Sequence, residues 1–288
     1  MPFVETPEVK LHYTEHGDGD RVALFIHGNL GCVQWMDLVW DYLPPALRVI
    51  AVDWRGCGDS DKPEPKPDYS NYSMPTHAGD MLAVLDALDI ARCDLTCHST
   101  GGIIATHMLL MAPERFSKVL ALDPVGPMGL TLTPGAIDLF KAMKSDRSVA
   151  AFGLASAAPT LFDLSWGVTP VTGGWPPYSP TATPMQRALF ELIVDKTRLL
   201  SDGIWFGTAY NLNLERETGA LRGRQESITH PHLVLWGEFD QWIPREDVEE
   251  MARRMPNCQL VVVPGVGHSL NLEKPTAFAQ YARDFLLG

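Results

Sequence analysis

The sequence predicts an α/β protein with a mostly parallel, doubly wound sheet, and two patterns lead to this fold class. Short, continuous apolar runs recur along the chain, as expected of strands that are buried on both faces of a sheet. Helical patterns follow most of these runs, and this alternation is typical of parallel sheets. A chain of 288 residues is long enough for one large domain or for a core with an insertion.

The predicted strands follow in chain order. Residues 9–16 alternate between apolar and polar side chains and predict an opening strand. The apolar, β-prone runs predict buried strands at residues 22–26, 49–52, 93–97, 119–122, 233–236 and 260–263.

The predicted helices carry apolar side chains on one face. This spacing predicts helices around residues 81–88, 248–255 and 278–285. Ser73 is a candidate N-cap for the first of them, and Pro75 falls in its first turn. In sheets of this kind active sites lie beyond the carboxyl ends of the strands, so functional residues are expected in the loops that follow the strands.

The alternation of strands and helices breaks between about residues 124 and 225. This stretch holds two helix-like pieces, at 137–143 and 185–200, and a segment at 167–180 that is loop by composition. We interpret residues 1–124 as the first part of a core, 125–225 as an inserted, mainly helical cap, and 226–288 as the second part of the core. The alternative is that residues 125–225 simply extend the core.

The bulk composition limits the partners of the protein. A formal net charge of −12 argues against a broad basic patch for nucleic acid or an anionic membrane surface. The five cysteines are odd in number and lack metal-like spacing, so we expect free thiols and no metal. The chain shows no secretory leader and no apolar run long enough to span a membrane, and a cytoplasmic location is expected. The oligomeric state is left open.

The segment around Ser99 is the most informative part of the chain. An apolar strand candidate ends in Cys97-His98-Ser99-Thr100-Gly101 and passes directly into an apolar helix candidate at residues 103–111. A serine at a sharp turn between a strand and a helix exposes its hydroxyl to a substrate, and small neighbours are needed because the two backbones nearly touch there. Ser99 is therefore a candidate nucleophile.

These residues resemble the nucleophile elbow, G-x-S-x-G, of the α/β-hydrolase family, with Cys97 in place of the first glycine. Four further segments resemble motifs of this family: His27-Gly28, the D-x-R-G-x-G-x-S loop at 53–60, the G-x-x-D loop at 237–240 and the G-x-G-H loop at 265–268. The resemblance extends from residue 27 to residue 268. It implies an α/β-hydrolase fold with a helical cap, and serine hydrolase chemistry without a cofactor.

The resemblance also implies a catalytic triad in the chain order nucleophile, acid, histidine. Ser99 would be the nucleophile, His268 its base, and Asp240 the acid that orients the imidazole. Asp123 ends the strand at 119–122, where some members of the family carry the acid instead, so it is the alternative.

The same resemblance places the oxyanion hole. Its two N–H donors would come from Thr100 and Asn29, with Leu30 as the fallback for the second. The side chain of Asn29 is a candidate for a second polar contact with substrate. His98 is expected to line the core or the pocket wall, and the glycines and Arg55 of the 53–60 loop are expected to be structural.

The substrate is constrained by the nucleophile and by the cap. Relatives that open epoxides or remove halides use aspartate at the position of Ser99, so acyl chemistry is favoured. Aromatic residues of the cap predict an apolar pocket; they are Trp166, Trp175, Tyr178, Trp205, Phe206 and Tyr210. We therefore expect hydrolysis of an apolar ester or lactone. The alternatives are a carbon–carbon bond hydrolase acting on a diketone-like acid and a ligand receptor with a slow or vestigial triad.

Overall fold

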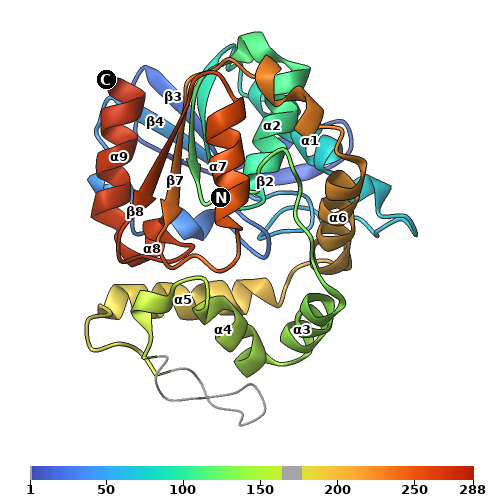
Figure 1. Ribbon diagram of the computed structural model, residues 1–288, viewed down its shortest axis with the longest axis vertical. Coiled ribbons are helices and arrows are strands. Elements are labelled where there is room, and N and C mark those ends of the chain that lie inside the picture. The colour runs from blue at the N-terminus through green and yellow to red at the C-terminus, as the bar shows by residue number, and fades with distance from the viewer. Residues whose placement is uncertain (1, 164–176) are drawn as a thin grey trace.

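The core of the protein is one eight-stranded sheet with helices on both faces (Figure 1). The computed structural model describes residues 2–163 and 177–288. The strands are β1 (Phe3–Glu5), β2 (Lys10–His16), β3 (Arg21–Ile26), β4 (Leu47–Val52), β5 (Cys93–His98), β6 (Phe116–Leu122), β7 (His232–Gly237) and β8 (Cys258–Val263). Their order in the sheet is β1-β2-β4-β3-β5-β6-β7-β8, and from β4 to β8 all neighbours are parallel.

The predicted fold class is confirmed, and each predicted strand lies within two or three residues of an observed one. β1 was missed because three residues are too short to show a period of two. It pairs antiparallel with β2, which itself pairs antiparallel with β4. The antiparallel part of the sheet is therefore confined to one edge, away from the strands that carry the predicted site.

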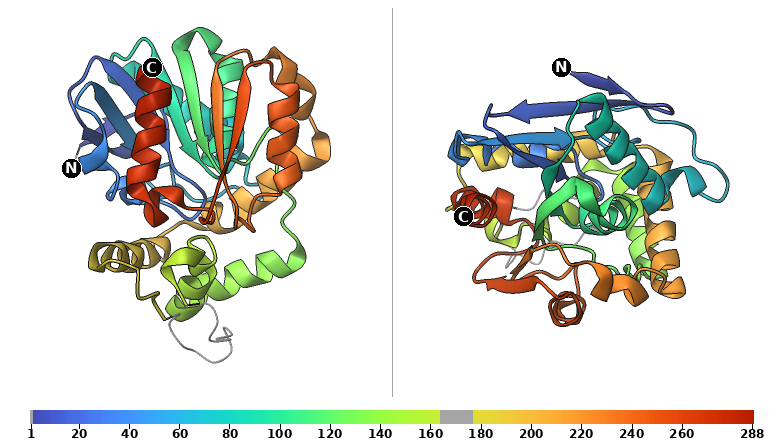
Figure 2. Two further views of the ribbon diagram at one scale, coloured as in Figure 1. Left: turned by 60° about the vertical axis from the view of Figure 1, so that its left-hand side comes forward. Right: turned by 90° about the horizontal axis from the view of Figure 1, so that it is seen from above.

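The continuous apolar runs arise because the sheet is buried on both faces. Along β3, Leu24 and Ile26 belong to one hydrophobic cluster, whereas Ala23 and Phe25 belong to a second. The helices of the core are α1 (Met74–Ala87), α2 (Gly101–Met111), α7 (Arg245–Arg254), the short α8 (Leu270–Glu273) and α9 (Pro275–Leu287). Figure 2 shows α9 on one side of the sheet and the other long core helices across from it.

The first core helix begins as its sequence predicts. The hydroxyl of Ser73 accepts a hydrogen bond from the N–H of Thr76 at 3.3 Å, and Pro75 occupies the first turn. An N-cap of this type satisfies one of the backbone donors that every helix leaves unpaired at its start.

The region from 125 to 225 contributes a separate helical layer and one helix beside the core. The helices α3 (Pro134–Ser145), α4 (Arg147–Ala155) and α5 (Pro184–Thr197) form a layer beyond the carboxyl ends of the parallel strands (Figure 1). In contrast, α6 (Thr208–Thr218) lies against the core, where Glu215 bonds to His107 of α2 at 2.7 Å and Arg216 to Asp247 of α7 at 2.9 Å. The three-part division of the chain stays a prediction.

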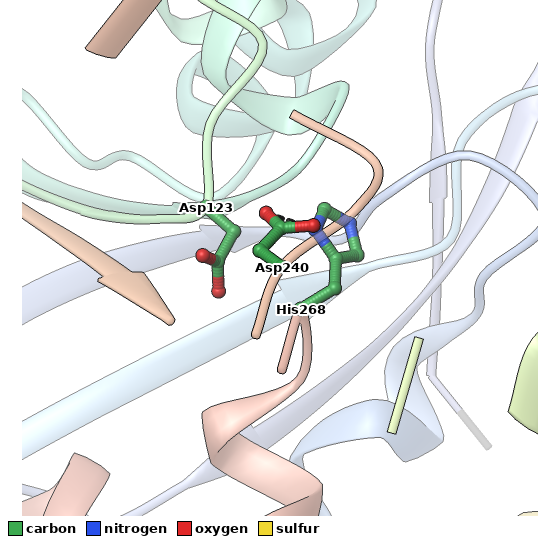
Figure 3. Close-up of side chains that lie close together, drawn as sticks. All are labelled: Asp123, Asp240 and His268. Atoms are coloured by element: carbon green, nitrogen blue, oxygen red, sulfur yellow. Dashed lines mark hydrogen bonds and ion pairs between the residues drawn. The ribbon is translucent and has the colours of Figure 1, made fainter. Parts of the chain in front are cut away.

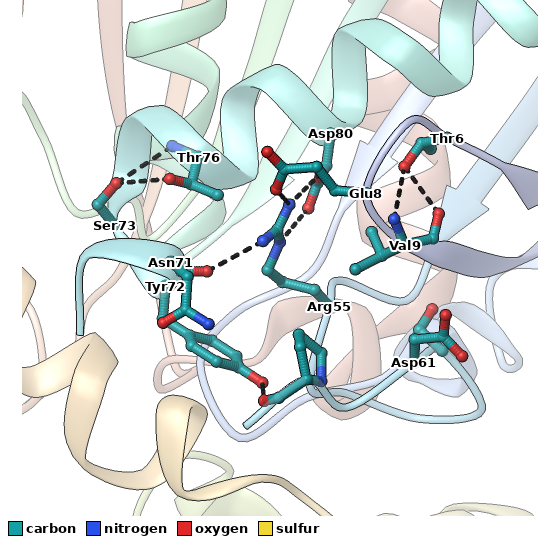
Figure 4. A network of polar contacts seen from close by, with 12 residues as sticks. Thr6, Glu8, Val9, Arg55, Asp61, Asn71, Tyr72, Ser73, Thr76 and Asp80 are labelled. Carbon is teal, nitrogen blue, oxygen red and sulfur yellow. Dashed lines mark hydrogen bonds and ion pairs between the residues drawn. The ribbon is translucent and has the colours of Figure 1, made fainter. Parts of the chain in front are cut away.

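The loop after β4 is held by a buried ion-pair network (Figure 4). The guanidinium of Arg55 donates to both carboxylate oxygens of Asp80 on α1, at 2.6 and 2.7 Å, and to Glu8 at 2.9 Å. It also donates to the backbone carbonyl of Asn71 at 3.1 Å. Arg55 is therefore occupied with the fold and does not face a substrate.

The cysteines are all free, and four of the five are buried. Burial raises the pKa of Cys93, Cys97 and Cys258 to about 12, so these thiols are neutral near pH 7. Within the described ranges, the structure contains no helix that is long and apolar enough to cross a membrane.

Candidate active site

Ser99 lies at a sharp turn between β5 and α2, with a left-handed backbone (φ 52°). This conformation costs energy for any residue with a side chain, and it persists only where the surroundings enforce it. A Cβ added to Gly102 would lie 2.5 Å from Cβ of Pro124, and one added to Gly101 would collide with the carbonyl oxygen of Ile26. The turn therefore requires glycine after the serine, as the motif indicated.

Cys97 takes the place of the first glycine of the motif without disturbing the sheet. It pairs in register with Ile26 of β3 and with Ala121 of β6, and it is 1% exposed. Its side chain is packed as an ordinary small core residue of β5.

His268 and Asp240 are joined across the loops that follow β8 and β7. Nδ1 of His268 lies 2.9 Å from Oδ2 of Asp240. Because an ionised carboxylate only accepts, Nδ1 is the donor of this bond and carries a proton. The other oxygen, Oδ1, accepts from the N–H of Trp242 at 2.7 Å and of Ile243 at 3.3 Å. Burial tends to raise the pKa of Asp240, but His268 and these hydrogen bonds hold it below its usual range.

Asp123 lies beside Asp240 with its backbone also left-handed (φ 42°) (Figure 3). It is completely buried, and Oδ1 accepts from the N–H of Gly237 at 2.7 Å. Burial and the neighbouring charge of Asp240 raise the pKa of Asp123 well above its usual range. With both carboxyls ionised, Oδ2 of Asp123 would have no partner; a proton on Asp123 allows it to donate to Asp240.

The same three residues form a group that, by distance, could hold a metal ion in the described chain. One ligand atom each from Asp123, Asp240 and His268 lies within 4.8 Å of the others. Asp240 and His268 already pair with each other at 2.9 Å, and the sequence supplies no further ligand motif. The arrangement suits proton transfer better than metal binding.

A cavity lies beside the elbow, with about 540 Å³ of empty space including its mouth. The described residues that line it are Asn29, Leu30, Trp35, His98, Ser99, Thr100, Leu130, Leu132, Phe140, Leu154, Ala157, Leu212, Trp242, Ile243 and His268. The predicted nucleophile and base therefore share one cavity. Among the described residues, no hydrogen bond joins the Ser99 hydroxyl to Nε2 of His268 or to any other group, so the two residues share the cavity without a direct bond between them.

The predicted oxyanion donors also border this cavity. The backbone N–H groups of Asn29 and Thr100 donate to no acceptor among residues 2–163 and 177–288. Leu30, the fallback donor, also lines the cavity and has a left-handed backbone (φ 58°). The loop that contains it is held to α5, because the hydroxyl of Thr197 donates to the Leu30 carbonyl at 3.1 Å. The loop after β3 thus has unpaired donors close to Ser99.

Four aromatic residues that the sequence assigned to the pocket are not among the described residues that line this cavity. Trp205 is fully buried and packs on Phe140, while Tyr178 contacts Phe162. The ring of Phe206 lies beneath the ammonium of Lys144, and Tyr210 is 49% exposed beside Tyr69. These side chains stabilise the packing of the helices instead, which composition alone does not distinguish. Trp166 and Trp175 lie outside the described residues.

The sequence missed most of the residues that do line the cavity. Trp35, Phe140 and Trp242 supply its aromatic surface, and leucines of the 125–225 region supply much of the rest. Only Trp242 had a signal, because it directly follows the Asp240 loop. Two arginines of the 125–225 region form ion pairs with helix α7: Arg216 pairs with Asp247, and Arg222 pairs with Glu250. No lysine or arginine is among the described residues that line the cavity.

Comparison with known proteins places this geometry in context. A family model described as "alpha/beta hydrolase fold" matches residues 22–275. The 2-hydroxy-6-oxononadienedioate/2-hydroxy-6-oxononatrienedioate hydrolase of Burkholderia vietnamiensis is 27% identical, over 97% of this chain and 91% of that protein. The solved structure of Est816, described as an N-acyl homoserine lactone degrading enzyme, is 27% identical with a TM-score of 0.72, over 99% of this chain and 100% of that chain. An esterase from Exiguobacterium antarcticum, 22% identical over 99% of both chains, has a TM-score of 0.77 and shares the fold.

Proposed function

Because the chain belongs to the alpha/beta hydrolase fold family, we propose that it is a serine hydrolase that cleaves an apolar carboxylic ester or lactone through an acyl-enzyme. One observation carries this proposal: Ser99 and His268 line the same cavity, while the far nitrogen of His268 bonds to buried Asp240 at 2.9 Å. A serine hydroxyl needs a base held in one tautomer, and this pair supplies it.

The reaction follows from the positions of these groups. The Ser99 hydroxyl attacks the scissile carbonyl as Nε2 of His268 takes its proton, and the N–H groups of Thr100 and Asn29 stabilise the oxyanion. The imidazolium then gives the proton to the alkoxide as the C–O bond breaks, and the acyl group stays on Ser99. An ester releases its alcohol at this step, whereas the hydroxyl of an opened lactone remains part of the acyl group. Water, deprotonated by the same imidazole, attacks this ester, and the proton returns to Ser99 as the acid leaves.

We assign the acid of the triad to Asp240 and not to Asp123. The direct bond from Asp240 to Nδ1 and its lowered pKa support an ionised carboxylate that stabilises the imidazolium. The raised pKa of Asp123 supports a neutral carboxyl, which cannot serve in this role.

A second candidate is a carbon–carbon bond hydrolase that acts on a diketone-like acid. The name of the Burkholderia vietnamiensis relative favours it. A substrate of this kind carries a carboxylate, and the described lining of the cavity offers it no cation. We therefore rank it below ester or lactone hydrolysis, and the receptor hypothesis below both.

The test uses the purified protein, p-nitrophenyl butyrate and an organophosphonate fluorophore. Wild type should turn over the ester and be labelled once, and Ser99→Ala should lose the label and at least about a thousandfold in kcat. Ser227→Ala is the matched control, because that exposed hydroxyl bonds only to the Arg224 carbonyl. Full activity or labelling of Ser99→Ala would refute the nucleophile. Cleavage of a vinylogous diketone acid but no ester would favour the second candidate, and tight binding without any turnover would favour a receptor.

A further inference from the structure

The indole of Trp242 lies nearly parallel to the imidazole of His268. The centroids of the two rings are 5.8 Å apart and their planes are inclined by 19°, so the rings stack. Both residues line the cavity that contains Ser99. The face of an aromatic ring carries partial negative charge, and here it lies beside the group that becomes a cation in the proposed reaction.

Two parts of the fold hold the indole in this orientation. The backbone N–H of Trp242 donates to Oδ1 of Asp240 at 2.7 Å, which ties the residue to the loop after β7. The indole N–H donates to the hydroxyl oxygen of Ser156, just after α4, at 3.1 Å. That hydroxyl in turn donates to the carbonyl of Gly153 at 2.6 Å. The indole therefore cannot turn away from His268 without losing a hydrogen bond.

The titratable groups that face His268 from neighbouring elements add no competing positive charge. Asp240 bonds to Nδ1 at 2.9 Å, and Asp123 lies beside it (Figure 3). Burial, and then the neighbouring His268, lower the pKa of the His98 ring, 4.8 Å away, to about 3, so this ring is neutral near pH 7. Glu273 accepts from the backbone N–H groups on both sides of His268, at 2.8 and 3.4 Å. No lysine or arginine is among the described residues that line the cavity.

The stacked contact favours the charged form of the imidazole over the neutral form. A cation within about 6 Å of the centroid of an aromatic ring is attracted by the negative face of that ring, and tryptophan gives the strongest attraction. Neutral His268 gains much less from the same contact. Because the imidazole is neutral before each proton transfer and cationic in the transition state, the contact lowers the barrier instead of stabilising both states equally.

We propose that the face of the Trp242 indole stabilises the imidazolium of His268 during both acylation and deacylation. Asp240 stabilises the same cation from the edge of the ring, through Nδ1, and Trp242 stabilises it from the face. Ser156, on the cap side of the cavity, keeps the indole in place. This inference rests on the proposed serine hydrolase function and adds a further residue to its catalytic machinery.

The kinetic test replaces Trp242 with 5-fluoro-, 5,7-difluoro- and 5,6,7-trifluorotryptophan by nonsense suppression. Fluorine withdraws electron density from the face of the indole and changes its shape little. The kcat/KM for p-nitrophenyl butyrate should fall stepwise with each fluorine, by about three- to thirtyfold in total.

Trp40 is the matched control for this series. It stacks on His16 at 5.3 Å and 18°, a similar geometry, and it is not among the described residues that line the cavity. The same three analogues at Trp40 should leave kcat/KM unchanged. A rate that is independent of the number of fluorines at Trp242 would show that this residue is only an apolar part of the wall.

A titration without substrate separates failure of this inference from failure of the proposed function. The imidazole of His268 is followed by ¹H–¹⁵N NMR as the pH changes, and its signal is identified by its loss in His268→Gln. The midpoint of the titration should lie about 0.4–1.5 pH units lower with trifluorotryptophan at position 242 than in wild type, because the charged form loses its partner.

The two measurements together give distinct outcomes. If wild type cleaves the ester but fluorination at Trp242 leaves the titration midpoint unchanged, the inference is refuted while the hydrolase proposal stands. A lower rate with an unchanged midpoint also refutes it, because the fluorines would then act on the substrate. If nothing is cleaved but the midpoint moves as expected, the contact with the imidazolium stands and the proposed reaction fails.

Discussion

Replacing Asp123 by asparagine or by alanine tests whether this carboxyl is held protonated behind Asp240. Its Oδ1 accepts from the buried N–H of Gly237 at 2.7 Å, and a proton on Oδ2 would be donated to Asp240. Asparagine preserves both bonds, because its oxygen accepts and its NH₂ group donates. Alanine removes both, and it leaves the N–H of Gly237 buried without an acceptor.

The expected magnitudes follow from these bonds. An unpaired buried donor costs about 1–3 kcal/mol, so Asp123→Ala should lower the free energy of unfolding by at least that amount. Asp123→Asn should stay within about 1 kcal/mol of wild type at pH 5. It should also retain most of the esterase turnover, whereas Asp240→Asn should lose about 10⁴-fold because it fixes the wrong tautomer of His268.

The pH dependence gives the sharper test. A folded-state pKa above the unfolded value means that native Asp123 binds a proton that the unfolded chain has released above about pH 5. Stability from this group is therefore complete at low pH and is lost as pH rises, by about 1.4 kcal/mol per pH unit up to its folded pKa. The lowered pKa of Asp240 acts in the opposite sense, but only at lower pH, where the unfolded carboxyl takes up a proton.

Urea denaturation of wild type and Asp123→Asn at pH 5, 6 and 7 measures this difference. The free energy of unfolding of the variant should rise relative to wild type as the pH increases, by at most about 1.4 kcal/mol for each pH unit. Parallel curves for the two proteins would show that Asp123 is ionised, and equal stability of the alanine and asparagine variants would show that its hydrogen bonds contribute nothing.

Two further predictions concern the loops around the site. Gly101→Ala should lower the free energy of unfolding by more than about 2 kcal/mol in urea denaturation, because the new methyl group would collide with the carbonyl of Ile26. Gly79→Ala in α1 is the control: its methyl group would have no atom within 4 Å, and it should raise the free energy of unfolding by about 0.5–1 kcal/mol. Equal effects of the two substitutions would contradict the close approach of strand and helix at Gly101. Arg55→Ala should lower the free energy of unfolding by about 3–5 kcal/mol, because it leaves buried Asp80 unpaired, and it should not change KM for p-nitrophenyl butyrate. Glu249→Ala removes an exposed ion pair with Arg245 and should lower the free energy of unfolding by less than about 1 kcal/mol. A raised KM with normal stability in Arg55→Ala would instead place this residue at the substrate.

The sequence alone determined the features that depend on neighbouring residues. Strands that are buried on both faces of a parallel sheet need continuous apolar runs, so these runs predicted the strands. The small residues around Ser99 predicted the sharp turn, because strand and helix approach closely there. Chain order and the loop motifs then selected His268 and Asp240, which the structure brings into one hydrogen-bonded pair.

Only the tertiary structure decided which side chains face the cavity and which carboxyl contacts His268. Trp205 and Tyr210 have the same apolar character as Trp35 and Phe140, but packing directs the first pair away from the cavity and the second pair to its wall. Asp123 and Asp240 both follow strands, and they differ because one contacts His268 while the other is buried against its neighbour's charge. Both outcomes depend on contacts between segments that are distant in the chain, and no local pattern encodes such contacts.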